Sequence, residues 1–189
     1  MKDFTRIYGD NTLHIGGELR TIPLTQGQTA LVDAADFDGL IGHRWRANRN
    51  GGTFYASTKS EDGRQVYMHR FITHAPDGFE VDHINGNGLD NRRKNLRLAS
   101  RQENARNRSV QRNSTTKLKG VYRAGDKFRA VICVDDKLLH LGVFNAPEIA
   151  ALAYDLAARR LFGEFARPNF NSVTDCLERL GARHAQRQT

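Results

Sequence analysis

The segment at residues 81–108, VDHINGNGLDNRRKNLRLASRQENARNR, constrains the fold of this chain more than any other part of the sequence. It begins with an Asp-His pair and continues into a loop rich in Asn and Gly, which tolerate positive φ angles. Residues 95–98, NLRL, are typical of a short return strand. Ser100 and Glu103 have the spacing of a capping box, which predicts a helix beginning at Arg101. The segment therefore predicts the order strand, loop, strand and helix.

Three side chains of this segment suit a hydrolytic site. Asp82 offers a carboxylate oxygen from the first strand, and Asn104 offers an amide oxygen from the helix. Oxygen ligands suit Mg²⁺, which takes only one or two protein groups together with water and substrate phosphate. His83 follows Asp82, and a neutral imidazole near pH 7 can take a proton from water. In a regular strand these neighbours lie on opposite faces, so a bend at the loop is needed to bring both to one site.

This segment resembles the HNH nucleases, in particular the phage and intron-encoded homing endonucleases with a ββα-metal site. The resemblance rests on Asp82 to Asn87, Leu89 to Arg92, Asn95 to Arg97, and Glu103 with Asn104. It implies that His83 is the general base and that Asp82 and Asn104 bind Mg²⁺ or Mn²⁺. It also implies that Asn95 holds the loop and helps to orient His83. The third position of the family motif is often a second His, and Asn is a variant of the homing branch, whose enzymes often nick one strand.

The charge of the chain is concentrated around this segment. The 189 residues include 29 Lys and Arg against 21 Asp and Glu, a net charge of +8, with a pI near 9.9. Residues 84–130 contain 13 basic and 3 acidic residues, whereas residues 1–83 contain 9 and 11, and residues 131–189 contain 7 of each. A net +10 over 47 residues exceeds what a solvated surface requires. It indicates an acidic partner, and double-stranded DNA is the expected one.

Ten side chains in or near the basic region are candidates for DNA contact. Residues 109–118 are polar and basic with too few apolar residues to fold alone, so we interpret them as a linker along the DNA backbone. The ten candidates are Arg70, Arg92, Arg93, Arg97, Arg108, Lys119, Arg123, Lys127, Arg129 and His140.

Residues 1–78 are predicted to form a small antiparallel β region, whose balanced charge favours a scaffold or a role in recognising DNA shape. Residues 34–41 are predicted to be helical, with Asp33 as N-cap. Asn50-Gly51-Gly52 and Asp62-Gly63 are turn signals between short strands. The region resembles, less specifically, the part that commonly precedes the motif in phage HNH proteins.

Two groups of residues in this region each have two interpretations, and the sequence leaves both open. Arg44, Arg46 and Arg49 lie near one turn and are either phosphate contacts or solvated surface. His69 lies upstream of the Asp-His pair and is either a structural or substrate-adjacent residue or a metal ligand.

Residues 119–171 are predicted to form a second compact unit. Short strands surround the turns at Gly125-Asp126 and Asp135-Asp136, and a helix begins near Pro147 with Asn145 as N-cap. One face of the second strand is predicted to be buried because apolar residues alternate at Phe128, Ala130, Ile132 and Val134. The helix carries an apolar stripe of Ile149, Leu152, Ala153 and Leu156. These patterns predict three antiparallel strands packed on one helix.

This unit resembles the ethylene-response-factor (APETALA-two) type of DNA-binding domain. The resemblance covers about fifty residues and rests on Gly120 to Tyr122, Lys127 to Ala130, His140 to Phe144, Glu148 to Ala151, Ala153 to Asp155, and Asn169 with Phe170. It implies that the sheet face opposite the helix lies in the major groove, where the candidate contacts are Arg123, Lys127, Arg129 and His140. A ribbon of two or three strands fits that groove, and Arg can bind the O6 and N7 of guanine there.

The remaining features narrow the class of protein and its location. Residues 172–189 predict a short helix and a loose tail, the helix having an apolar face of Val173, Leu177 and Leu180. Two cysteines cannot form a four-cysteine zinc site. No apolar run approaches the ~20 residues of a membrane span, and the first ten residues do not resemble a signal peptide. We therefore expect a cytoplasmic protein of a bacterial or phage-infected cell, with a monomer as the simplest state.

These patterns predict an α+β chain with five parts: a β-rich region at 1–78, a ββα-metal nuclease unit at 79–108, a basic linker at 109–118, a three-stranded antiparallel sheet packed on one helix at 119–171, and a short helix with a tail at 172–189. The predicted function is metal-dependent hydrolysis of phosphodiester bonds in duplex DNA by an HNH homing-type endonuclease. The alternative is a phage-encoded DNA-binding regulator with an inactive nuclease unit. The enzyme is favoured because a decayed site is expected to lose at least one of Asp82, His83, Asn95 and Asn104.

Overall fold

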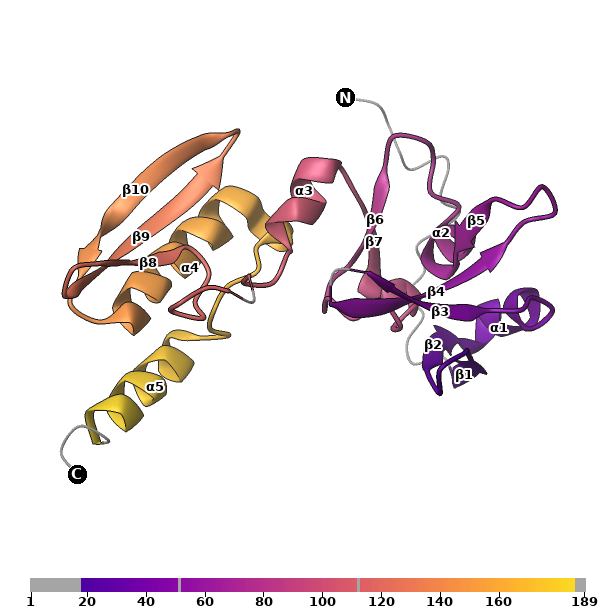
Figure 1. Cartoon of the computed structure of the whole chain (residues 1–189), viewed down its shortest axis with the longest axis horizontal. Coiled ribbons are helices and arrows are strands. Elements are labelled where there is room, and N and C mark those ends of the chain that lie inside the picture. Colours follow the sequence, from indigo (N-terminus) through magenta and orange to yellow (C-terminus); the bar gives the residue numbers. More distant parts are fainter. Residues whose placement is uncertain (1–17, 51, 112, 186–189) are drawn as a thin grey trace. The chain divides into compact units, whose positions relative to one another are not determined.

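The structure is a computed structural model, and it describes residues 18–50, 52–111 and 113–185 (Figure 1). The predictions for residues 1–17 and 186–189 lie outside the described residues. The small antiparallel sheets and the helices confirm the predicted α+β class.

The chain divides into two compact units, each built from two stretches of sequence. The first unit contains residues up to 75 together with 87–97, and the second contains 76–86 together with the residues from 98 onwards. The division therefore runs through the segment at residues 81–108.

The first unit contains two antiparallel sheets among its described residues. β1 (Leu19–Pro23) pairs with β2 (Thr29–Asp33), and α1 (Ala34–Ile41) follows directly. A three-stranded sheet has the order β3 (Arg46–Asn50), β4 (Thr53–Lys59) and β5 (Gln65–Tyr67), and α2 (Met68–Thr73) follows it. Trp45 is 4% exposed and donates from its indole nitrogen to the Leu40 carbonyl at 2.8 Å, which ties α1 to the start of this sheet.

The loop at residues 87–97 is part of the first unit and contains η2 (Arg93–Asn95). Leu31 of β2 holds this loop from both sides, because its N–H donates to the Leu89 carbonyl at 2.8 Å and its carbonyl accepts from Asn91 at 2.7 Å. The carboxylate of Asp33 accepts from the Arg93 N–H at 2.7 Å and makes no side-chain cap for α1. Asp33 is the N-cap residue of α1, as predicted, but its side chain anchors the loop and does not cap the helix.

β6 (Glu80–His83) of the second unit pairs with β7 (Leu96–Ala99), a strand whose last two residues belong to this unit, and α3 (Arg101–Arg106) follows. A three-stranded sheet then has the order β8 (Val121–Ala124), β9 (Lys127–Val134) and β10 (Lys137–Phe144). α4 (Pro147–Phe162) lies along one face of this sheet (Figure 1), and η3 (Gly163–Phe165) and α5 (Val173–Ala185) complete the unit.

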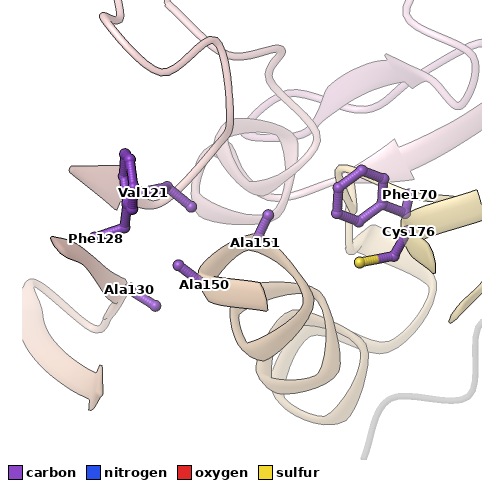
Figure 2. Close-up of a cluster of buried hydrophobic side chains, with 7 residues drawn as sticks. All are labelled: Val121, Phe128, Ala130, Ala150, Ala151, Phe170 and Cys176. Atoms are coloured by element: carbon purple, nitrogen blue, oxygen red, sulfur yellow. The ribbon is translucent and has the colours of Figure 1, made fainter. Parts of the chain in front are cut away.

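The core of the second unit lies between this sheet and α4. As predicted, Phe128, Ala130 and Ile132 of β9 are buried. Figure 2 shows the larger cluster, whose members are Val121, Phe128, Ala130, Ala150, Ala151, Phe170 and Cys176. A second cluster contains Ile132, Tyr154, Ala158 and Phe162.

The helices of this unit bury faces that the prediction identified only in part. Leu152 and Ala153 of the predicted stripe pack against the larger cluster. Leu156 is 57% exposed, and the buried face of α4 is formed by Ala150, Ala151, Tyr154, Ala158 and Phe162. Alanine side chains let the helix backbone approach the sheet closely, which a count of large apolar residues does not detect. The N-cap of α4 is Ala146 rather than Asn145. In α5, Cys176 is fully buried whereas Val173 and Leu177 are about half exposed.

A buried carboxylate ties β8 to the chain after α4. Asp155 accepts hydrogen bonds from the N–H groups of Asn169 at 2.7 Å and Phe170 at 2.8 Å. The side-chain oxygen of Asn169 in turn accepts from the N–H of Lys119 at 2.6 Å. Burial raises the pKa of Asp155, and these donors oppose the shift.

Candidate functional site

The helix α3 begins as the sequence predicted. The Ser100 hydroxyl accepts from the Glu103 N–H at 3.2 Å, and the Glu103 carboxylate accepts from the Ser100 N–H at 2.8 Å. This capping box satisfies two N–H groups that a helix leaves unpaired, so it fixes where the short helix starts.

Two side chains at the end of this helix reach two side chains of β6. Asn107, the C-cap residue, donates from Nδ2 to both carboxylate oxygens of Asp82, at 2.8 and 3.0 Å. Three residues earlier, the Nδ2 of Asn104 donates to the carboxylate of Glu80. Alternate residues of a strand lie about 6.6 Å apart on one face, close to the 5–6 Å between residues i and i+3 of a helix. The two pairs form together because these spacings nearly agree.

The sequence predicted that Asp82 and Asn104 share one ion, and the structure gives Asp82 a different hydrogen-bonding partner, Asn107. The bond to Glu80 orients the Asn104 amide so that its nitrogen faces that carboxylate. Its oxygen is then the atom left to act as an acceptor or ligand.

The main chain bends directly after His83. Asp82 and His83 are 4% and 5% exposed. The His83 carbonyl accepts from the Gly86 N–H at 2.7 Å and from Asn107 Nδ2 at 3.0 Å. Gly86 has a φ of +75°, which glycine adopts without strain. Asn107 therefore joins the Asp82 carboxylate to the backbone of the bend.

Arg167 brings a positive charge to the same bend. Its Nη1 donates to the Asn107 carbonyl at 3.4 Å. A Cβ at Gly86 would lie 2.3 Å from that Nη1, so a side chain there would require the guanidinium to move. A cation so close to an Asp-His pair suits an anionic ligand.

Asn95 lies in the first unit and is buried there. Its Nδ2 donates to the Asp90 carbonyl at 2.8 Å, which closes the loop between them. The Asp90 carboxylate accepts from Arg92 Nε at 2.7 Å and Nη2 at 2.6 Å. The loop is thus held by its own side chains.

Three of the ten predicted DNA contacts have their charge engaged within the protein. Arg92 pairs with Asp90, and Arg93 pairs with Asp36 at 2.7 Å. The Lys119 ammonium donates to the carbonyls of Arg106 and Arg108, at 2.5 and 2.8 Å. Burial lowers the pKa of Lys119 to about 8, and the nearby charge of Arg167 adds to the shift. Lys119 stabilises the carbonyl end of α3, so it is poorly placed for the predicted phosphate contact.

Three further candidates differ in how exposed they are. Arg70 donates to the Ala75 carbonyl at 3.0 Å, Arg97 is half-buried, and Arg108 is exposed.

The strand register sorts the four candidates on the β8–β10 sheet. Arg129 pairs with Tyr122 and Val143, and His140 pairs with Val131, so these residues share the face opposite the core. Lys127, two residues before Arg129, is on the same face and exposed. Arg123 pairs with buried Phe128 and lies 5.7 Å from its ring centroid, so it belongs to the helix-side face. Arg123 was predicted to lie on the same face as Lys127 and Arg129, and the register places it on the other face of the sheet.

Among the described residues, no group of three or more His, Cys, Asp or Glu side chains could hold a metal ion. The predicted donor set is one carboxylate and one amide oxygen, which is the small hard set that Mg²⁺ accepts. Asp82 and Asn104 lie on β6 and α3 of one unit, and both side chains carry oxygen atoms of the kind that such a cation binds. The residues therefore fit a hard divalent cation and do not fit a structural zinc site.

Comparison with known proteins decides the family. Residues 67–106 match the HNH endonuclease family. An HNH endonuclease of Acanthamoeba polyphaga mimivirus, L560, is 33% identical over a stretch that covers 76% of each chain. The chain belongs to the HNH endonuclease family. Protein 3.8 of Escherichia phage T7 is also 33% identical to the present chain, over 49% of this chain and 77% of the phage protein.

Membership of this family places the chain among nucleases. None of the helices in the part of the chain that the structure describes has the length and apolar character of a membrane span.

Sequence reasoning missed three residues around the HNH bend: Glu80, Asn107 and Arg167. Glu80 and Asn107 were detectable, because Glu80 lies two residues before Asp82 on a strand and Asn107 lies three residues after Asn104 on a helix. Arg167 lies about eighty residues away from the bend in the sequence, so no local pattern indicates it.

Proposed function

We propose that this HNH protein is a metal-dependent homing-type endonuclease that hydrolyses phosphodiester bonds of double-stranded DNA. The observation that carries the proposal is the buried Asp82-His83 pair at a tight bend, with Asn104 and Asn107 brought to the same strand by α3. A carboxylate, an imidazole and an amide oxygen are the groups that such hydrolysis requires.

In this mechanism His83 is the general base, and its imidazole takes a proton from the attacking water. Asp82 and Asn104 would hold a divalent cation, with Asn107 orienting the first and Glu80 the second. When bound, Mg²⁺ or Mn²⁺ would stabilise the charge that develops on the phosphate and on the leaving oxygen. Asn95 supports the loop between the two strands, and we propose that it helps to orient His83.

Binding of duplex DNA is assigned to the remaining basic candidates. Arg108 follows the HNH helix and is exposed, and Arg70 and Arg97 are half-buried residues within the stretch that matches the family. On the β8–β10 sheet the proposed contacts are Lys127, Arg129 and His140, as in the ethylene-response-factor type of domain. Tyr122 and Val143 lie on the same face and are 54% and 50% exposed, so they are available for apolar contact with bases.

The test is cleavage of DNA from the genome that carries the gene, with products mapped at nucleotide resolution. We expect cleavage with Mg²⁺ or Mn²⁺, none with EDTA, and a decrease of at least about 100-fold in rate for the His83→Ala variant. His74→Asn is the matched control, because His74 is exposed and its φ of +49° is one that Asn tolerates.

If His83→Ala cleaves as well as the wild type, the assignment of the base is wrong. The alternative of a DNA-binding regulator with an inactive nuclease unit predicts DNA binding without cleavage under every metal condition. Gel-shift measurements on the same DNA distinguish that outcome from a chain that does not bind DNA.

A further inference from the structure

The β3–β4–β5 sheet of the first unit has two faces of different character. Ala47 and Ala56 are partners across β3 and β4 and are 6% and 1% exposed, which identifies the buried face. Partners across strands share a face, so the opposite face carries a different set of residues. That set includes Arg46, Lys59 and Gln65, which are exposed, and Asn48, which is half-buried. It also includes Ser57, which is 6% exposed between Arg46 and Tyr67, and the half-buried Tyr55 and Tyr67.

This polar face borders a hollow of about 350 Å³ that opens to solvent. Among the described residues that line the hollow, three are cationic and none is acidic. The cations are Arg46, Arg49 and Lys59. Within the part of the chain that the structure describes, neither Arg46 nor Lys59 forms an ion pair.

Two acidic residues of the same unit pair with other cations. Asp36 pairs with Arg93, and Asp62 pairs with Arg64. The described lining of the hollow is therefore cationic, although residues 1–83 as a whole contain more acidic than basic residues. A cationic hollow is complementary to an anionic partner.

The free edge of β3 argues against an added peptide strand. The Ala47 N–H donates to the Thr25 hydroxyl at 3.1 Å, and the Ala47 carbonyl accepts from Gln26 Nε2 at 2.9 Å. The turn that contains Thr25 thus occupies the hydrogen-bonding groups in the middle of that edge. A partner must therefore contact the side chains of the face instead of extending the sheet.

We propose that this face is a second DNA-contacting surface, which enters the major groove and places Arg46, Asn48 and Gln65 toward base edges and Lys59 toward phosphate. Strands lie about 4.8 Å apart, so the face spans roughly 10 Å from β3 to β5, and the groove is about 12 Å wide. Arg suits guanine, and Asn and Gln suit adenine. The inference rests on the proposed DNA substrate and is independent of the cleavage chemistry.

The experiment uses the full chain carrying His83→Ala, with EDTA and short random-sequence duplexes, so that the DNA stays intact. Affinity is measured across a range of salt concentrations for Arg46→Gln, Lys59→Gln and the double variant. Removing one phosphate interaction should reduce the slope of log K against log salt by about 0.9. Arg64→Gln is the control, because Arg64 is exposed on the same unit but already paired with Asp62.

We expect weaker binding for both single variants, with a reduced slope for Lys59→Gln and no change for the control. Selection from a randomised duplex pool should show relaxed preference at one position for Asn48→Ala, with an unchanged slope. If the double variant binds DNA with the affinity and slope of Arg64→Gln, the surface does not contact DNA and the proposal is overturned. Thermal unfolding of each variant verifies that the fold is kept.

Failure of this inference is distinguishable from failure of the proposed function. The double variant Arg46→Gln and Lys59→Gln is also made in the chain that keeps His83. If this chain cleaves DNA in a metal-dependent way and binds DNA as the wild type does, only the proposed surface is rejected. If the variants weaken binding although the chain that keeps His83 never cleaves DNA, the surface is supported and the nuclease is rejected.

Discussion

At the scale of single residues, the HNH site depends on which amide contacts which carboxylate. Two asparagines lie three residues apart, and in the structure Asn104 donates a hydrogen bond to Glu80 and Asn107 donates one to Asp82. Asn107 is itself buried and donates to the Asp82 carboxylate and to the His83 carbonyl. We infer that it is a positioning residue, which orients the carboxylate without touching substrate.

Replacing Asn107 should therefore alter the response to metal as well as stability. Asn107→Ala removes two hydrogen bonds to a buried carboxylate, so we expect a decrease of about 1.5–3 kcal/mol in the free energy of unfolding. The Mg²⁺ concentration for half-maximal cleavage should rise, because Asp82 is no longer held in one orientation. Asn107→Asp should be worse, since it places a second carboxylate beside Asp82. Asn113→Ala, at an exposed position of the linker, is the control, and equal metal dependence of Asn107→Ala and wild type would contradict the role.

Lys119 predicts a specific effect of pH on stability. Its pKa falls from 10.5 to about 8 on folding because the ammonium is buried. Between these values the unfolded chain binds a proton that the folded chain does not, so this group makes the free energy of unfolding rise with pH. Urea unfolding at about pH 7.5 and about pH 9.5 should show the wild type gaining stability relative to Lys119→Met as pH rises. Lys137→Met, at an exposed position, is the control variant, and a constant difference for Lys119→Met would refute the buried cation.

At the scale of elements, the sequence predicted where strands and helices occur better than which faces they bury. The alternation in β9 identified its buried residues, because a strand has a strict period of two. The buried face of α4 was missed because it is made largely of alanines, whose burial depends on how closely the sheet approaches. Only the register of β8 on β9 showed that Arg123 and Arg129 lie on opposite faces of the sheet.

The packing of the start of β8 against α4 is so close that adding one methyl group at Gly120 should disrupt it. Gly120 has a φ of +73°, and a Cβ there would lie 2.0 Å from the ring of Tyr154 in α4 and 2.7 Å from the Val131 carbonyl. Gly125 has a similar φ of +62° but has nothing within 4 Å of the same position. Gly125→Ala should cost about 1–2 kcal/mol of unfolding free energy from backbone strain alone, and Gly120→Ala should cost clearly more. Equal losses in urea unfolding would show that the junction is loose.

At the scale of the whole molecule, the two units are interleaved in sequence. The loop at 87–97 belongs to the first unit because Leu31 and Asp33 hold it by backbone and carboxylate hydrogen bonds. A boundary near residue 78, which composition suggested, leaves this loop out. Contacts between residues about sixty positions apart carry no local signal in the sequence.

A fragment that ends at residue 97 should accordingly be more stable than one that ends at residue 78. The shorter fragment loses the bonds from Leu31 and Asp33 to the loop and exposes the β4 backbone that Gly88 covers. Thermal unfolding followed by Trp45 fluorescence compares the two, since this single tryptophan is buried in the first unit. A shorter fragment with the same melting temperature would mean that the loop contributes nothing to the unit.

The sequence alone determined the features that depend on near neighbours. Residue types at short spacing predict four of these features, because local backbone preferences decide them. They are the capping box, the turn after His83, the alternating strand, and the HNH motif with Asp82 and Asn104. Only the tertiary structure decided that Asn107 binds Asp82, that Lys119 supports α3, and that Arg167 lies over Gly86. Those contacts depend on how a strand, a helix and a distant segment pack together. The entropic cost of closing a long loop depends only weakly on its length, so separation along the sequence does not indicate which distant residues will meet.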